Sequence, residues 1–160
     1  MKTFTIVLLF MSLVVAGIEI PGATGKTATR SITWHLVEKD AGFNFIDNPP
    51  RQGDNAPPLI GDQFAFRSEM LTRLGRHAGW LNATCVVTTG GTRGAGPCNG
   101  VFSFKGGQLM AQALVSFTTE TTEVVIVGGT GVYRGARGSV VSVSRGETEF
   151  SDDVFHLVLP

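Results

Sequence analysis

The chain has 160 residues, of which 42% are hydrophobic and 16% are charged, and its formal net charge is zero. That length leaves room for one domain. The balanced charge gives no sign of the basic surface with which proteins bind nucleic acids or anionic membranes, so we discard nucleic-acid binding. The 21 glycines and the low charge content favour turns and strands over long helices, so we expect an all-β domain.

The N-terminal segment is predicted to be a signal peptide. Lys2 supplies the positive charge, residues 4–18 form an apolar run, and residues 23–25 (Ala-Thr-Gly) have the small-x-small pattern of a cleavage site. The run is short for a membrane-spanning helix, which favours a cleaved leader over an anchor. We therefore expect a signal peptide over residues 1–25, one domain over residues 26–160, and a secreted protein that leaves the membrane after cleavage.

Eight strands are predicted from the alternation of apolar and polar residues. The first, residues 29–37, places Trp34 and Leu36 on one face and His35 on the other. The others are expected at residues 61–71, 74–87, 100–104, 108–115, 121–127, 139–144 and 150–159. Eight strands at this spacing, with no convincing helix, indicate a barrel or a sandwich, and an eight-stranded barrel can enclose one small ligand.

A long loop follows the first strand. Residues 47–58 hold four of the seven prolines, and a loop of this length in a small domain is typically functional or a lid. Asp62 and Arg76, on the adjacent strands predicted at residues 61–71 and 74–87, are expected to form a cross-strand ion pair.

The two cysteines are predicted to form a disulfide. Cys85 and Cys98 flank a glycine-rich connection that brings the ends of two neighbouring strands together, and a secreted protein folds in an oxidising compartment. A zinc site would need further convergent ligands, and a nucleophilic cysteine would be lost to oxidation, so both alternatives are weaker.

Residues 128–131 (Gly-Gly-Thr-Gly) mark a sharp corner between two strands. Glycine allows positive φ angles and close backbone approach. A phosphate-binding loop is the alternative, but it requires a following helix, and residues 139–143 have strand composition instead. The motif is therefore interpreted first as a structural corner.

Residues 128–138 (Gly-Gly-Thr-Gly-Val-Tyr-Arg-Gly-Ala-Arg-Gly) resemble the signature of plant dirigent proteins, and the Gly-Gly-x-Gly-x-aromatic core is also similar to allene oxide cyclases and their bacterial relatives. Residues 45–50, 61–66 and 75–79 resemble other segments of these families. The resemblance covers the chain from about Thr33 onward. It implies an eight-stranded antiparallel β-barrel that packs as a homotrimer.

The resemblance also implies catalytic candidates. Asp47 matches a dirigent aspartate implicated in acid catalysis and is our first choice of catalytic acid; its alternative role is an Asx turn that starts the proline loop. Residues 34–40 resemble the first strand of the allene oxide cyclases, which adds His35 and Glu38 as candidates. His35 stands where those cyclases carry a catalytic glutamate, and its alternative role is that of a structural histidine bonded to a neighbouring group.

Aromatic and basic residues complete the candidate site. The residues expected to contact the substrate or line the lumen are Trp34, Phe64, Phe66, Tyr133 and Arg134. The three histidines lie on separate predicted strands without metal-ligand spacing, so we expect no metal and no cofactor.

These residues lead to one functional hypothesis and one alternative. The barrel is expected to bind a small hydrophobic molecule, such as a polyketide, terpenoid, phenolic or lipid-like compound, and to direct its stereocontrolled cyclisation or isomerisation. Conformational restraint and one acid with a raised pKa would supply the catalysis. The alternative is a secreted binding or surface protein that keeps the barrel without the chemistry.

Overall fold

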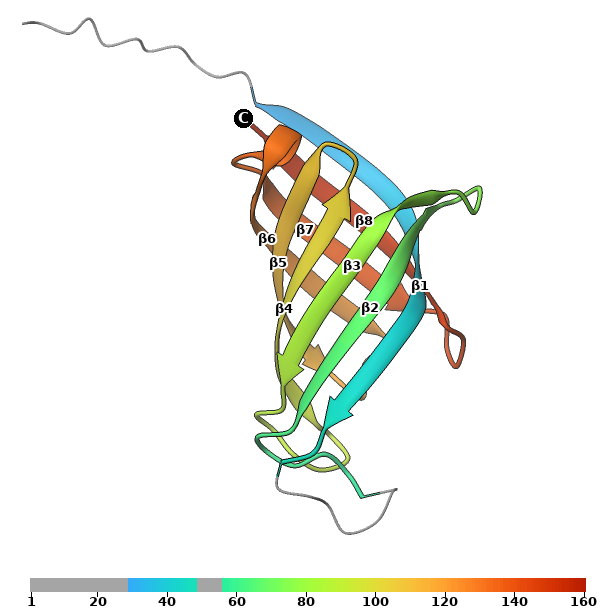
Figure 1. The fold of residues 1–160 in the computed structure, drawn as a ribbon, viewed down its shortest axis with the longest axis vertical. Coiled ribbons are helices and arrows are strands. Elements are labelled where there is room, and N and C mark those ends of the chain that lie inside the picture. Colours follow the sequence, from blue (N-terminus) through green and yellow to red (C-terminus); the bar gives the residue numbers. More distant parts are fainter. Residues whose placement is uncertain (1–28, 49–55) are drawn as a thin grey trace, which may run out of the picture.

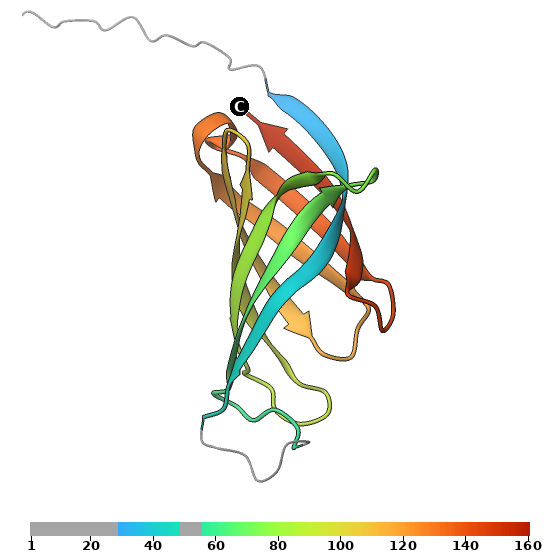
Figure 2. The ribbon, with the colours of Figure 1, turned by 45° about the vertical axis from the view of Figure 1, so that its right-hand side comes forward.

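The structure, a computed structural model, describes residues 29–48 and 56–160. Each strand pairs with the next in the chain, and the last pairs with the first, which closes an antiparallel barrel (Figures 1 and 2). The strands are β1 (Arg30–Ile46), β2 (Gln63–Thr72), β3 (His77–Val86), β4 (Ala95–Phe104), β5 (Gly107–Ser116), β6 (Thr121–Gly129), β7 (Arg137–Ser144) and β8 (Phe150–Leu159). The predicted eight-stranded all-β barrel is confirmed.

Helical structure is almost absent from the described residues. A 3-10 turn, η1 (Gly131–Tyr133), is the one helical element among them. No helix in residues 29–48 and 56–160 has the length and hydrophobicity needed to cross a membrane. The predicted signal peptide and residues 49–55 of the proline loop lie outside the described residues.

Strand β1 is twice as long as the strand predicted at residues 29–37. Its first part pairs with β8, from Arg30 opposite Leu159 onward, and its second part pairs with β2 as far as Ile46. The residues expected to end the strand instead form a bulge between Asp40 and Gly42. A bulge bends and twists a strand without breaking it, so β1 continues along the barrel (Figure 1).

The glycine motif forms the predicted corner between β6 and β7. After Gly129 the chain turns through η1, where the Val132 amide donates to the Gly106 carbonyl at 3.0 Å and the Tyr133 hydroxyl donates to the Lys105 carbonyl at 3.3 Å. The corner is thereby fastened to the β4–β5 turn. The phosphate-loop alternative is wrong, because only the three-residue 3-10 turn η1 and then strand β7 follow, and not an α-helix.

Aromatic side chains fill the interior of the barrel near η1. Trp34 meets the rings of Phe104 and Tyr133 edge to face, at centroid distances of 5.6 and 5.8 Å, and Phe155 packs against Phe102 and Phe104 at 5.0 and 5.9 Å. These packing geometries are favourable for aromatic pairs. This half of the barrel is a solid core, which leaves the other half for a cavity.

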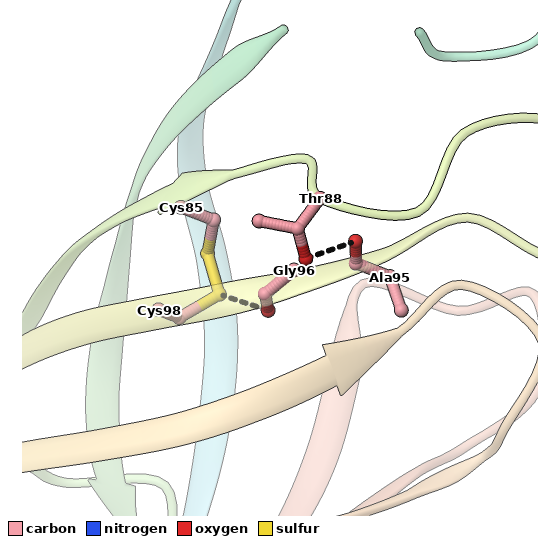
Figure 3. Close-up of a disulfide and its surroundings, with 5 residues drawn as sticks. All are labelled: Cys85, Thr88, Ala95, Gly96 and Cys98. Carbon is pink, nitrogen blue, oxygen red and sulfur yellow. Dashed lines mark hydrogen bonds between the residues drawn. A yellow bond between two sulfur atoms is a disulfide. The ribbon is translucent and has the colours of Figure 1, made fainter. Parts of the chain in front are cut away.

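The Cys85–Cys98 disulfide is present, as predicted. The two residues face each other across β3 and β4, with their Cα atoms 4.1 Å apart, and both side chains are buried (Figure 3). The Thr88 hydroxyl donates to the Ala95 carbonyl at 3.4 Å just beyond the bridge. The disulfide therefore clamps the base of the loop that joins these strands.

Replacing both cysteines with alanine is expected to lower the free energy of unfolding by about 3 kcal/mol, because the open chain regains the entropy of a short loop. Urea denaturation of the oxidised protein and the double variant measures the difference. The reduced wild-type protein serves as the control and should match the variant closely. Equal stability of all three forms would contradict the prediction.

The predicted ion pair between Asp62 and Arg76 is wrong. The two residues lie at opposite ends of β2. The buried Asp62 carboxylate instead accepts hydrogen bonds from the backbone amides of Asn48 and Leu59, at 2.9 and 2.8 Å. It thereby holds together the two ends of the proline loop.

Candidate functional site

A cavity of about 180 Å³ lies inside the barrel, beside the aromatic core. Every strand contributes to its wall, and most of the lining is apolar, including Phe66, Leu81, Phe102 and Val124. Cys98 of the disulfide also reaches it. Two acidic side chains, Glu38 from β1 and Asp153 from β8, interrupt this apolar surface.

Strand parity and register bring the two acids together. Glu38 shares its parity with Trp34 and Leu36, so it faces inward with the core residues of β1. Asp153 shares its parity with Phe155 in the same way. In the β1–β8 register Leu36 pairs with Asp153 and Glu38 pairs with Ser151, which makes the two acids diagonal neighbours on the inner face.

Burial is the main influence on the Asp153 carboxyl. The residue is only 1% exposed, and neither of its carboxyl oxygens has a well-formed hydrogen bond among the described residues. Burial, with the neighbouring Glu38 carboxyl as the next cause, raises its pKa to about 8, while the Ser142 hydroxyl opposes the rise. At neutral pH Asp153 is therefore a neutral acid able to donate a proton.

Glu38 has the same environment in a milder form. Burial raises the pKa of its carboxyl, and the charge of Asp40 adds to the rise, whereas the nearby Ser68 and Asp153 side chains lower it. Ser68 is fully buried on β2 beside Glu38. The cavity is thus bordered by a carboxyl pair that retains a proton at neutral pH, with the Ser142 hydroxyl in the same lining.

The preceding residue on β8, Asp152, has a pKa that its surroundings shift in the opposite direction. Asp152 points outward, where both its oxygens accept hydrogen bonds from Arg145, at 2.8 and 2.6 Å. These bonds lower the pKa of Asp152. Two consecutive aspartates therefore have pKa values shifted in opposite directions, which is the pattern expected when only one of them belongs to a site.

The three predicted catalytic residues do not lie together. Glu38 lines the cavity, whereas His35 lies on the outer face, where its Nδ1 accepts a hydrogen bond from Arg73 Nη2 at 3.0 Å. Asp47 follows the end of β1, nine residues beyond Glu38, which corresponds to about 30 Å of extended strand. Catalytic roles for His35 and Asp47 stay predictions, separate from the carboxyl pair.

The predicted substrate-binding residues divide among three places. Phe66 lines the cavity, and Phe64 lies at the end of the barrel near the proline loop. Trp34 and Tyr133 belong to the aromatic core and, with His35, border a surface hollow of about 500 Å³ near η1. Arg134 is exposed directly after η1.

The end of the barrel near the proline loop carries an aromatic hollow of about 450 Å³. Phe43, Phe45, Phe64 and Phe117 line it, and Val115 belongs to the lining of both this hollow and the inner cavity. The Phe64 and Phe117 rings meet edge to face at 5.4 Å. An apolar molecule approaching the cavity from this end would meet an apolar, mainly aromatic surface.

A larger hollow, of about 680 Å³, lies on the outside of β1 to β6. Its polar lining includes Asn44, Asn82, Asn99 and Arg67, and no acid, histidine or cysteine is among the described residues that border it. Although this hollow is larger than the inner cavity, none of these side chains can act as an acid or base in it. The inner cavity is therefore the candidate site.

Sequence reasoning identified Glu38 and missed Asp153. The signal was available in the alternation of β8, because Asp153 is in phase with Phe155, Leu157 and Leu159. An acid at an inward position of a barrel strand is unusual unless it is paired or functional. No group of three potential metal ligands converges anywhere in residues 29–48 and 56–160.

No protein-family model matches the chain, and no curated protein matches it in sequence. Solved structures share its barrel. Pyocyanin demethylase superimposes with a TM-score of 0.65 at 19% identity, over 79% of this chain and 99% of its own. The exo-specific intermolecular Diels-Alderase AbnU has a TM-score of 0.63 at 13% sequence identity, over 82% of this chain and 98% of its own. The pterocarpan synthase dirigent protein PsPTS1 has a TM-score of 0.61 at 15% sequence identity, over 83% of this chain and 95% of its own.

These comparisons establish the fold. The chain has the barrel of dirigent-like proteins and of cyclases such as the Diels-Alderase, as the glycine-rich corner predicted. The more specific resemblance to allene oxide cyclases stays a prediction. At identities below 20%, the chemistry of this chain has to be argued from its own cavity.

Proposed function

We propose that the protein binds a small, largely hydrophobic molecule in its lumen and directs the cyclisation or isomerisation of that molecule. The observation that carries this proposal is the buried Glu38–Asp153 pair in the wall of an otherwise apolar cavity. The similarity to a Diels-Alderase and a dirigent protein, both with this barrel, supports it. The proposed mechanism requires no metal or cofactor.

In the proposed mechanism Asp153 acts as a general acid. As a protonated carboxyl it donates to a carbonyl or similar oxygen of the substrate, which polarises the adjoining π system. Glu38, as a carboxylate, accepts a proton from the substrate. The apolar wall restrains the substrate in one folded conformation, and such restraint lowers the barrier of an intramolecular reaction.

Cavity size limits the substrate. A volume of about 180 Å³ is below the ~300–1,000 Å³ of most ligand pockets. The reacting part is therefore small, and any longer apolar portion extends towards the aromatic hollow lined by Phe45 and Phe64.

Filling the cavity is expected to abolish ligand binding. Ala83→Phe places a ring in the lumen, where Ala83 is buried, whereas Thr84→Phe places the same ring on the outer face. Native mass spectrometry of each protein with its co-purified molecule is the measurement. We expect a bound small molecule in the wild type and in Thr84→Phe, and none in Ala83→Phe. Equal occupancy in both variants would remove the lumen from the proposal.

The same experiment addresses the binding-protein alternative. The recovered molecule, or its biosynthetic precursor, is incubated with the wild type and with Glu38→Gln. Conversion to a rearranged product by the wild type, lost in Glu38→Gln, supports an enzyme. Recovery of the molecule unchanged with both proteins supports a secreted binding protein.

We further propose that the protein is secreted and forms the homotrimer that the dirigent resemblance implies. The disulfide is compatible with an extracellular location. Strands β5 and β6 expose an apolar outer face, with Leu114 69% exposed and Met110, Val125 and Val127 about half exposed. A face of this kind on a soluble protein marks an interaction surface.

The mass of the assembled protein tests the trimer. Native mass spectrometry is expected to show three subunits for the wild type and a single subunit for Leu114→Lys, because a buried lysine without a partner opposes assembly. Arg134→Lys, a change in an exposed residue near η1, is the control and should stay trimeric. A monomeric wild type would refute the trimer and leave the lumen proposal standing.

A further inference from the structure

The carboxyl pair lacks a positive partner. Glu38 and Asp153 line the cavity, and the charged residues that act on them are Asp40 on β1 and Asp152 on β8, which are also acidic. No lysine, arginine or histidine is among the described residues that border the cavity. From β2 and β7, the neutral Ser68 and Ser142 face the pair. A ligand is therefore the missing source of positive charge.

Several buried polar atoms of this site also lack a well-formed hydrogen bond. Among the described residues this holds for both oxygens of Asp153 and for the hydroxyl of Ser68. Leaving such groups poorly paired destabilises the folded protein. Because Asp153 lines the cavity, a molecule in the lumen can supply the missing donors.

We propose that the lumen ligand carries a protonated nitrogen, as an amine or basic heterocycle, at the end that lies against Glu38 and Asp153. This inference rests on the proposed function and specifies the substrate class. An ammonium group brings up to three N–H donors, whereas an alcohol or phenol brings one, and a carboxylate brings none. The aromatic rings of Phe66 and Phe102, which also line the cavity, provide faces that attract cations.

Binding of such a ligand involves a proton exchange. Below pH 8 the free site holds its proton on Asp153. A cation beside the pair favours an ionised carboxyl, so any proton on Glu38 passes to the buffer, while the ammonium group keeps its own protons and Asp153 keeps the proton that the proposed mechanism uses. Neutral ligands leave the proton in place.

Three probes of similar shape test the proposal: benzylamine, benzyl alcohol and benzoate. Calorimetry at pH 6.5 is expected to show benzylamine binding about tenfold or more tightly than benzyl alcohol, with benzoate weakest. Repeating the benzylamine titration in two buffers of different ionisation enthalpy should reveal up to one proton released per site. Benzyl alcohol should release none.

Methyl resonances of Ala83, Ala111 and Ala113, which all line the cavity, report where the probes bind. Glu38→Gln is expected to keep benzyl alcohol binding and lose the preference for benzylamine, and Asp153→Asn provides a second variant. Asp152→Asn, on the outer face of β8, is the matched control and should behave like the wild type.

The possible outcomes separate the two proposals. Equal affinity for amine and alcohol, with shifted alanine methyls, would overturn the cationic ligand and leave lumen binding intact. A preference for benzylamine that survives in both Asp153→Asn and Glu38→Gln would overturn it as well. If no probe moves the alanine methyls, lumen binding fails and the proposed function fails with it.

Discussion

Asp153→Asn is expected to stabilise the protein more at pH 9 than at pH 5, by about 4 kcal/mol. In the folded protein Asp153 keeps its proton up to a pH of about 8, whereas the unfolded chain releases it near the ordinary value of 3.8. Between these values the folded state binds the extra proton, so the stability of the wild type falls as pH rises. Above pH 8 both states are ionised and the full cost of the buried charge remains.

Asparagine removes this cost because its amide does not ionise. Urea denaturation of the wild type and variant at pH 5, 7 and 9 is the measurement. Asp152→Asn controls for general effects of the substitution: its carboxyl is exposed and bonded to Arg145, so its difference from the wild type should stay constant over this range. If Asp153→Asn destabilises the protein equally at pH 5 and pH 9, Asp153 does not carry the raised pKa described above.

Gly131→Ala is expected to lower the free energy of unfolding by about 4 kcal/mol. Gly131 has a φ of +59°, a conformation that costs a side chain about 1–2 kcal/mol. A Cβ atom there would also collide with the backbone carbonyl of Gly106. The corner must then shift away from the β4–β5 turn, which breaks the Val132 hydrogen bond to Gly106 and disturbs Tyr133 in the aromatic core.

Gly128→Ala is the matched control for the corner. Gly128 belongs to the same motif, but its φ is not positive and a Cβ atom would meet no atom within 4 Å. We expect less than about 1 kcal/mol of change. Trp34, whose ring lies 5.8 Å from that of Tyr133, reports unfolding by fluorescence. Equal effects of the two substitutions would show that the motif does not fasten the corner.

The residue patterns along the chain predicted most of the architecture because strand parity, turn chemistry and the disulfide are local properties. Alternation placed Trp34 and His35 on opposite faces of the first strand, and the glycine motif marked the corner at η1. The largest difference was β1, which runs from Arg30 to Ile46 where a shorter strand was predicted. The Asp40–Gly42 bulge kept the strand continuous, and a bulge depends on the partner strand as much as on the sequence.

Composition and alternation alone predicted an all-β chain of eight strands, arranged as a barrel or a sandwich. The resemblance to dirigent proteins and allene oxide cyclases predicted the closed barrel and made Glu38 a candidate. Only the tertiary structure decided that the carboxyl of Glu38 has Asp153 as its neighbour. The two residues are 115 positions apart, and they meet because β8 closes the barrel against β1 in a particular register. Alternation assigns each side chain to a face, but closure and register depend on the packing of all eight strands together.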